Sequence, residues 1–311
     1  LPTNLAPRDS GNPYADYTEA QLFTFLNGYQ LPRDPGSQYE YSNLGVGLLG
    51  LALARRAGMS YEALLTERVL RPLGMRDTRV TLTDDMRRRL ATGHADGQAV
   101  ENWDMAVLGG AGALRSTAND LLKYVAAYLA DDGPLHEALR MARTAQRPIP
   151  GGQIGLAWHI LEHGPVKIVW HNGGTGGYHT FVGFDPAAHR GVVLLANSAD
   201  EIDRIGVHVL DTTVAVEPVR RAVALDSTVL QRYVGRYELA PGFVIEVSRE
   251  GTSLFGQATG QGRFRLYPAS EREFFLTAVP AEVSFTLDST GAATAMVLHQ
   301  NGRDMPGRKL P

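Results

Sequence analysis

The residues best suited to chemistry lie in a glycine-rich stretch between two apolar segments. The stretch reads His171-Asn-Gly-Gly-Thr-Gly-Gly177, with four glycines in its last five residues. Glycines let a backbone approach a phosphate, another strand or an acyl group closely. A phosphate loop would run from a strand into a helix and carry Gly-Lys-Ser/Thr, whereas these glycines lie between two predicted strands. The sequence therefore argues against a phosphate and leaves the other two partners open.

A second stretch matches a zinc-binding motif. His159, Glu162 and His163 match the H-x-x-E-H pattern, which needs a helix to bring both histidines onto one face. The segment instead ends at Gly164-Pro165 and alternates in polarity like a strand. At ~3.3 Å per residue, the two histidines would stand roughly 13 Å apart, too far to share one zinc ion. We therefore expect a half-exposed strand, and no metal or organic cofactor.

No catalytic nucleophile can be recognised within the sequence. The absence of cysteine excludes a thiolate nucleophile, thiolate metal sites and disulfides. No Gly-x-Ser-x-Gly string occurs, so the nucleophile elbow of α/β-hydrolases is missing. The residues three positions before the three lysines are Asp120, Gly164 and Pro306, so Ser-x-x-Lys is missing as well.

Three strings in a fixed order nevertheless resemble the serine β-lactamase-like family. They are Tyr41-Ser42-Asn43 before an apolar helix, the helix start Gly112-Ala-Leu-Arg-Ser-Thr-Ala-Asn-Asp120, and the strand entering His171-Asn-Gly-Gly. The resemblance covers roughly residues 1–210 and includes class C β-lactamases, family VIII esterases and penicillin-binding D-alanyl peptidases. It implies an α/β fold, in which an antiparallel sheet is flanked by helices and a helical subdomain. The implied activity is serine hydrolysis, through an acyl-enzyme, of an ester, a β-lactam or a D-amino-acid amide.

The resemblance also implies roles for individual residues. Tyr41 would act as the general base, Asn43 would orient the reacting groups, and His171 would line the opposite wall. Gly173 and Gly174 would form the oxyanion and substrate-binding strand, where each N–H donor is worth ~3–4 kcal/mol. Free tyrosine titrates near 10, so a tyrosine base needs positive charge nearby, from the family's lysine or from a protonated histidine.

Each assignment has a structural alternative. Tyr41 could be a partly buried core residue, Asn43 a helix N-cap, and His171 an ordinary histidine at the end of a strand. The family's serine and lysine are expected upstream of Leu1, on a helix between the sheet and the helical subdomain. His171 and Asn172, in place of the lysine and threonine of β-lactamases, favour esterases and peptidases. The alternative functions are a catalytically inactive binding protein that retains the substrate cleft, and a purely structural fragment.

The composition is that of a globular protein, and the charge gives no sign of a nucleic-acid or membrane ligand. The 311 residues are 44% hydrophobic and 20% charged, and the net charge of −3 gives no support for nucleic acid or an anionic membrane as a partner. No apolar run approaches the length of a membrane span. We expect a small ester, β-lactam or peptide substrate, together with the missing N-terminal segment or a second chain. The resemblance implies a periplasmic or secreted location, although no signal sequence is visible.

These residues must be positioned by predicted helices and strands. The helix over Leu44–Ala54 is apolar on almost every side, which predicts that it is buried. Thr117 with Asp120 resembles a capping box. The remaining helices are expected over residues 18–29, 60–70 and 201–210 and after Thr117, and strands over residues 155–161, 166–170, 178–184 and 191–196.

The C-terminal part has a different character. We expect a linker over residues 211–224 and a second domain over residues 225–311. Alternating runs at Phe243–Val247, Arg263–Tyr267 and Glu282–Leu287 predict a small antiparallel barrel or sandwich. The segment resembles lipocalin-like barrels appended to some family members. A buttress or lid is the expected role, with small-ligand binding as the alternative.

Overall fold

The computed structural model describes residues 1, 11–95, 97–216, 222–260, 263–277, 281–300 and 302–310. These form two compact units, Leu1–Val216 and Glu217–Pro311. Residues 2–10 lie outside the described residues, as do residues 217–221 of the predicted linker. Among the described residues, no helix has both the length and the apolar character needed to cross a membrane.

Three helices of the first unit follow residues whose side chains cap them. Thr18 forms a full capping box with Gln21, and Ser60 and Thr117 each accept a hydrogen bond from the backbone N–H three residues on. The helices predicted over residues 18–29 and 60–70 and after Thr117 are confirmed. The elements are α1 (Glu19–Gly28), α2 (Asn43–Ala57), α3 (Tyr61–Leu65), the π-helical turn η1 (Thr66–Leu70), α4 (Asp84–Arg89), the 3₁₀ turn η2 (Ala106–Leu108), α5 (Gly109–Gly112), α6 (Ala118–Leu129), α7 (His136–Ala142) and α8 (Asp203–Leu210).

The predicted capping box at α6 is only half correct. Thr117 caps the helix, but the Asp120 carboxylate does not return to the N-cap. It accepts hydrogen bonds from the backbone N–H of Asp77 at 2.7 Å and from Thr78 Oγ1 at 3.0 Å, and it pairs with Lys123 Nζ at 2.6 Å. Asp120 is fully buried, so it anchors the 77–78 segment to α6.

The helix α2 forms where predicted, but the prediction that it is buried is wrong for one of its faces. Its inward face packs on η2 and α5 and consists of Leu44, Gly47, Gly50 and Ala54. On the other face Val46, Leu49 and Leu53 are 43%, 56% and 52% exposed. The reason is that an all-round apolar helix needs cover on several sides, and the described residues cover it on one side only.

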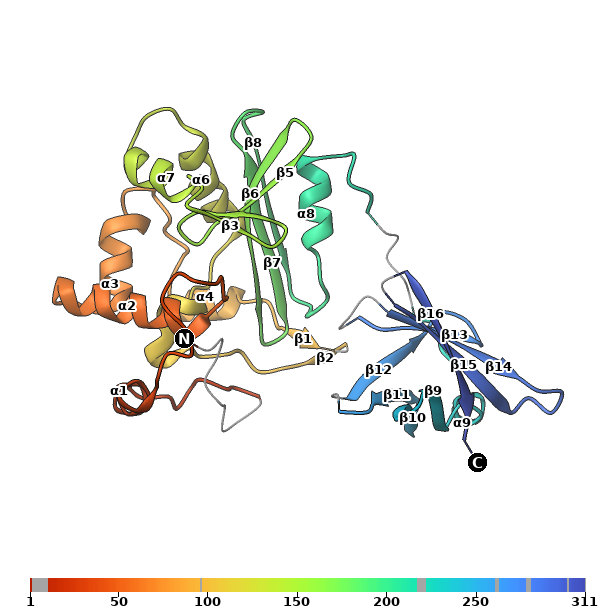
Figure 1. Cartoon of the computed structure of the whole chain (residues 1–311). Helices are drawn as coiled ribbons and strands as arrows, with labels where there is room; N and C mark the ends of the chain where they lie inside the picture. The colour runs from red at the N-terminus through yellow and green to blue at the C-terminus, as the bar shows by residue number, and fades with distance from the viewer. Residues whose placement is uncertain are drawn as a thin grey trace. The chain divides into compact units, whose positions relative to one another are not determined.

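The strands of the first unit form one six-stranded antiparallel sheet in the order β3-β4-β5-β6-β7-β8 (Figure 1). Each strand pairs with the next one in the chain, so the sheet is a meander. A separate short hairpin joins β1 (His94–Ala95) to β2 (Gln98–Ala99). The sheet strands are β3 (Arg147–Ile149), β4 (Gly152–Ile154), β5 (His159–His163), β6 (Val166–Thr175), β7 (Tyr178–Asp185) and β8 (Arg190–Ala196).

Helices cover both faces of this sheet, with α6 and α7 on one side and α8 on the other (Figure 1). Val125 and Tyr128 of α6 pack against Val169 and Phe184 on the first face. On the second face Leu210 of α8 joins a core that contains Ile168, Phe181 and Val192. The predicted fold class, an antiparallel sheet flanked by helices with a helical part before it, is confirmed.

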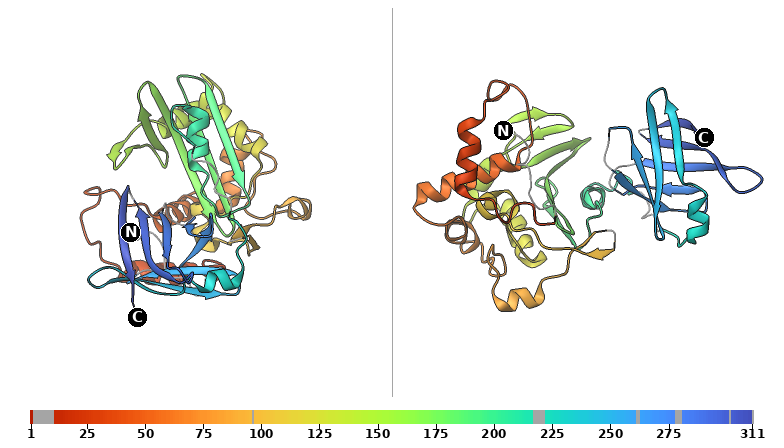
Figure 2. Two further views of the ribbon diagram at one scale, coloured as in Figure 1. Left: turned by 90° about the vertical axis from the view of Figure 1, so that its right-hand side faces the viewer. Right: turned by 90° about the horizontal axis from the view of Figure 1, so that it is seen from below.

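The second unit is a closed antiparallel barrel of eight strands, whose curvature Figure 2 shows in the blue part of the chain. The barrel alternative is thus confirmed over the sandwich. Its interior is filled by a continuous core that includes Tyr233, Tyr237, Phe285 and Met296. Its elements are α9 (Ser227–Gln231), β9 (Gly235–Ala240), β10 (Phe243–Glu250), β11 (Ser253–Ala258), β12 (Arg263–Pro268), β13 (Glu273–Phe275), β14 (Ala281–Leu287), β15 (Ala293–Gln300) and β16 (Arg303–Lys309).

Candidate active site

The fold brings two of the predicted site residues together. Tyr41 precedes α2, His171 lies on β6, and their ring centroids are 6.3 Å apart. Ser42, rather than Asn43, caps α2 by accepting the N–H of Gly45, so the N-cap alternative for Asn43 is wrong. Asn43 is the first residue of the helix, two positions beyond Tyr41. The start of α2 and the strand β6 therefore face one another through Tyr41 and His171.

The described residues do not give Tyr41 the lowered pKa that a general base would need. Its side chain is 45% exposed, and burial of the remainder, together with the nearby Tyr39, raises its pKa above the ordinary value. A raised pKa keeps the phenol protonated at neutral pH. A base role would therefore require a cation that these neighbours do not provide.

His171 presents one defined ring nitrogen to the site. Its Nδ1 lies 2.5 Å from the carbonyl oxygen of Asn172. A carbonyl can only accept, so Nδ1 carries a proton and the neutral ring has Nε2 available as an acceptor. His159 lies beside it, with ring centroids 5.4 Å apart, and burial together with the charge of His171 lowers the pKa of His159.

The two histidines of the H-x-x-E-H string contact different partners. His159 stacks on Trp170, whereas His163, at the far end of β5, bonds Asp211 Oδ2 at 2.7 Å. The strand geometry expected for this segment is confirmed.

The glycines of the strand serve two different purposes. β5 pairs with β6 only over Val166–Trp170, whereas β7 continues the pairing to Thr175. The edge of β6 beyond Trp170, which includes Gly173 and Gly174, is therefore not paired with β5. A Cβ at Gly174 would meet nothing within 4 Å, so this position is open. By contrast, a Cβ at Gly177, where φ is +73°, would lie 2.5 Å from the backbone of Gly93, so this glycine is needed for close packing.

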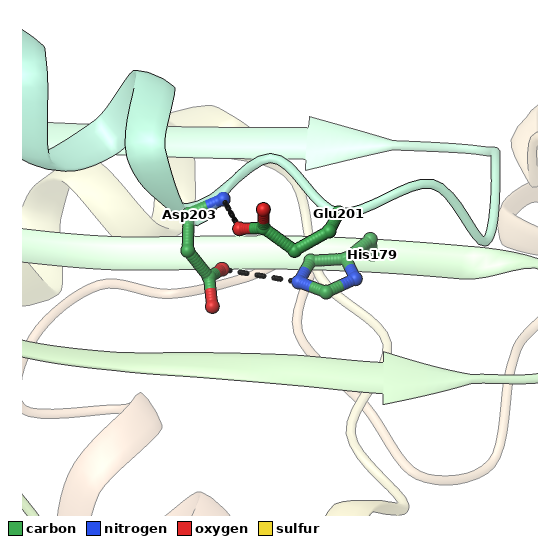
Figure 3. Close-up of side chains that lie close together, drawn as sticks. All are labelled: His179, Glu201 and Asp203. Carbon is green, nitrogen blue, oxygen red and sulfur yellow. Dashed lines mark hydrogen bonds and ion pairs between the residues drawn. The ribbon is translucent and has the colours of Figure 1, made fainter. Parts of the chain in front are cut away.

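Behind this strand lies a polar cluster that the sequence did not reveal. Asp203, the first residue of α8, accepts a hydrogen bond from Asn172 Nδ2 at 2.5 Å and bonds His179 Nε2 at 3.0 Å. The backbone N–H of Asp203 donates to the Glu201 carboxylate (Figure 3). Only the pairing of β6 with β7 and the packing of α8 bring these residues together, so no local sequence signal could have found them.

The cluster also contains the only metal-ligand set found among the described residues. His179, Glu201 and Asp203 offer ligand atoms that lie within 4.8 Å of one another. The imidazole nitrogen that would bind a cation is already hydrogen-bonded to Asp203, and Asp203 is also bonded to Asn172. These contacts satisfy the groups without an ion, so we assign the cluster a role in holding the strand.

A cavity of about 630 Å³ lies between the sheet and the helical part. On the sheet side the cavity is lined by Val182 of β7. Val182 is the residue that pairs with His171 of β6. Leu114 and Leu195 line it and remain 42% and 43% exposed. The other apolar side chains that line it include Leu65, Leu70, Met75, Leu121 and Tyr124.

Comparison with known families agrees with this geometry. The Beta-lactamase family model matches residues 1–208, more than half of the chain, so the chain belongs to the beta-lactamase family. Residues 219–309 match a family described as a domain of unknown function, DUF3471. Members of the first family are serine hydrolases, and the resemblance seen in the Tyr-Ser-Asn and His-Asn-Gly-Gly strings is thereby confirmed.

The relatives that the chain resembles include a penicillin-binding protein and a peptidase. It is 29% identical to Penicillin-binding protein 4* of Bacillus subtilis over 314 aligned residues, which cover 90% of this chain and 67% of that protein. It is also 29% identical to the D-alanyl-D-alanine-carboxypeptidase/endopeptidase AmpH of Escherichia coli, over 57% of this chain and 50% of that protein. A solved class C beta-lactamase shares the fold, with a TM-score of 0.60 over 70% of this chain and 67% of that one, at 24% identity. The chain thus spans about half to two thirds of the length of these relatives.

Proposed function

We propose that this chain is part of a serine hydrolase that works through an acyl-enzyme, and that it supplies the general base and one wall of the active site. The observation that carries the proposal is the 6.3 Å approach of the Tyr41 and His171 rings in a chain of the beta-lactamase family. The nucleophile belongs to a Ser-x-x-Lys helix that these 311 residues do not contain. That helix comes from a further segment of the same gene product or from a second chain.

The cavity between the sheet and the helical part is the proposed seat of that helix. Its apolar lining would receive the buried face of a helix, and covering it would bury the exposed sides of Leu114 and Leu195. Val182 lines the cavity and pairs with His171, so a helix seated there would lie one strand away from His171. The lysine of this helix supplies the positive charge that Tyr41 lacks.

The chemistry then runs in two steps. Tyr41, with its pKa lowered by the lysine, accepts the proton of the serine hydroxyl as the serine oxygen attacks the substrate carbonyl. Backbone N–H groups of the Gly173–Gly174 segment and of the serine bind the oxyanion, and the leaving group departs with a proton. Water, deprotonated by the same base, then cleaves the acyl-serine ester and regenerates the hydroxyl.

The preferred substrates are esters or D-amino-acid amides rather than β-lactams. An imidazole lacks the permanent positive charge of a lysine ammonium, so position 171 offers a weaker partner for the carboxylate of a β-lactam. The names of the two relatives above point to penicillin binding and to D-alanyl peptide hydrolysis. We also propose the periplasm or the cell exterior as the location, by analogy with such bacterial proteins.

A comparison of substrates tests this proposal. The protein that carries its Ser-x-x-Lys segment should hydrolyse a short-chain nitrophenyl ester with a kcat/KM well above that for a cephalosporin. A clear preference for the cephalosporin would contradict the substrate assignment. Stable binding of substrate without turnover of either compound would instead favour an inactive binding protein.

A further inference from the structure

One face of the strands β6 and β7 looks into the cavity between the sheet and the helical part. His171 of β6 pairs with Val182 of β7. Gly173, two positions further along β6, pairs with Thr180. Because side chains alternate between the faces of a strand and paired residues share a face, these four positions lie on one face of the sheet. Val182 and Thr180 both line the cavity, so this is the face that the cavity covers.

The hydroxyl of Thr180 lies directly against Gly173. A Cβ built on Gly173 would stand 2.7 Å from Thr180 Oγ1, which is closer than a carbon and an oxygen can pack. The hydroxyl therefore occupies the space that a side chain at position 173 would need. The glycine leaves this hydroxyl in place on the cavity side of the proposed oxyanion strand.

This hydroxyl differs from most others in the cavity wall because no described residue bonds it. The lining hydroxyls that bond another described residue are those of Thr78, Ser116, Thr117, Tyr124 and Tyr178. Within the described part of the chain, the lining hydroxyls of Thr175 and Thr180 have no such bond. No fully buried side-chain oxygen or nitrogen of the described residues lacks a partner, so the Thr180 hydroxyl is open to the cavity.

A helix seated in the cavity changes the surroundings of Thr180. Covering the wall removes water from the hydroxyl, and a buried hydroxyl without a partner is unfavourable. The helix can supply that partner, because its first four backbone N–H groups and the side chains of its motif serine and lysine are hydrogen-bond donors. Residues three positions apart share one face of a helix, so the serine and the lysine can both face the wall formed by β6 and β7.

We infer that Thr180 is a positioning residue, whose hydroxyl hydrogen-bonds the seated Ser-x-x-Lys helix and holds the motif serine over Gly173. The inference rests on the proposed hydrolase function and names the group of this chain that fixes the nucleophile. The hydroxyl takes no part in the chemical steps. It keeps the serine oxygen within reach of the substrate carbonyl while the adjoining N–H groups bind the oxyanion.

The first test compares thermal unfolding and needs no activity. Thr180→Val replaces the hydroxyl by a methyl group, and the variant is made in the 311-residue chain and in the longer protein with its Ser-x-x-Lys segment. All tryptophans of the 311 residues lie in the first unit, so their fluorescence follows that unit in the shorter chain. There the melting temperature should fall by no more than about 1 °C, because the hydroxyl has no partner to lose. In the longer protein it should fall by about 3 °C or more.

Thr175→Val is the matched control. It removes the other lining hydroxyl that bonds no described residue, two positions beyond Gly173 on β6. Its effect on the melting temperature of the longer protein should be less than about half that of Thr180→Val. An equal effect would show that the polarity of the whole wall matters and would overturn the role assigned to Thr180. Equal shifts of Thr180→Val in the shorter and the longer protein would overturn it too.

The second test separates this inference from the proposed function. In the longer protein, kcat/KM for a short-chain nitrophenyl ester should fall at least about tenfold in Thr180→Val, because the serine is no longer held in place. Thr180→Ser keeps the hydroxyl and should stay within about threefold of the wild type. An active enzyme with an unaltered rate in Thr180→Val, or equal losses in the two variants, contradicts the inference alone. Absence of ester hydrolysis by the wild type contradicts the proposed function, and the unfolding comparison still decides the role of Thr180.

Discussion

The ring of Tyr41, at the start of a helix, lies 6.3 Å from the ring of His171, on the central part of the sheet. The two residues belong to segments far apart in the chain. Tyr41 remains 45% exposed, so it is not a core residue. We propose that the pair forms two walls of one reaction site.

Replacing Tyr41 by phenylalanine should separate catalysis from stability. In the protein with its Ser-x-x-Lys segment, Tyr41→Phe should lower kcat by about 100-fold or more, which is the usual contribution of a general base. The free energy of unfolding should change by less than about 0.5 kcal/mol, because the residue is 45% exposed. Tyr39→Phe is the control, since Tyr39 is similarly exposed and lies two positions away. Equal rates for the two variants would remove Tyr41 from the mechanism.

Replacing Asp120, which anchors the 77–78 segment to α6, should cause a large loss of stability. Asp120→Ala leaves the N–H of Asp77 without its acceptor and removes one of two partners from Thr78 and from Lys123, which should cost about 2–4 kcal/mol. Asp84→Ala is the matched control, because that side chain is 87% exposed and pairs only with Arg87 on the surface of α4. Its effect should stay within about 0.5 kcal/mol. Urea unfolding followed by circular dichroism measures both, and comparable losses would show that Asp120 is not an anchor.

The pKa of Asp211 predicts how stability depends on pH. Hydrogen bonds from Thr213 and His163 lower this pKa to about 2 from the ordinary 3.8. Because the pKa is depressed in the folded state, the contribution of Asp211 is complete above pH 3.8 and is lost as the pH falls through about 2. Asp211→Asn should therefore lower the melting temperature at pH 7, and its difference from the wild type should shrink below about pH 4. A difference that is constant with pH would contradict the assignment.

The sequence predicted those features that local signals or an ordered set of motifs can carry. Thr18 and Thr117 are cap residues whose hydrogen bonds lie within one helical turn, so the sequence alone can indicate where their helices begin. The strings around Tyr41 and His171 predict the family, and the match to the Beta-lactamase family model confirms it. Alternating polarity was enough to reject a helix for the His159–His163 segment.

The failures have equally physical causes. The prediction that α2 is buried is wrong for one face, because hydrophobicity indicates which faces of a helix are apolar but not which segment packs against them. Asp203 and His179 were missed because only strand pairing and helix packing place them beside Asn172. In the barrel, β16 contains Pro306 and mixed charges, so its strand character depends on its neighbours rather than on its own residues.

The central claim is that the nucleophile lies on a Ser-x-x-Lys segment outside these 311 residues, and one labelling experiment tests it most directly. The chain is expressed from Leu1 to Pro311, shown to be folded, and treated with a serine-directed fluorophosphonate beside the longer protein that carries the segment. Peptide mass spectrometry then locates the label. We predict no labelled serine in the 311-residue chain, and a label on the motif serine of the longer protein. Labelling of a serine within the folded 311-residue chain, Ser116 in the cavity wall included, would contradict the account.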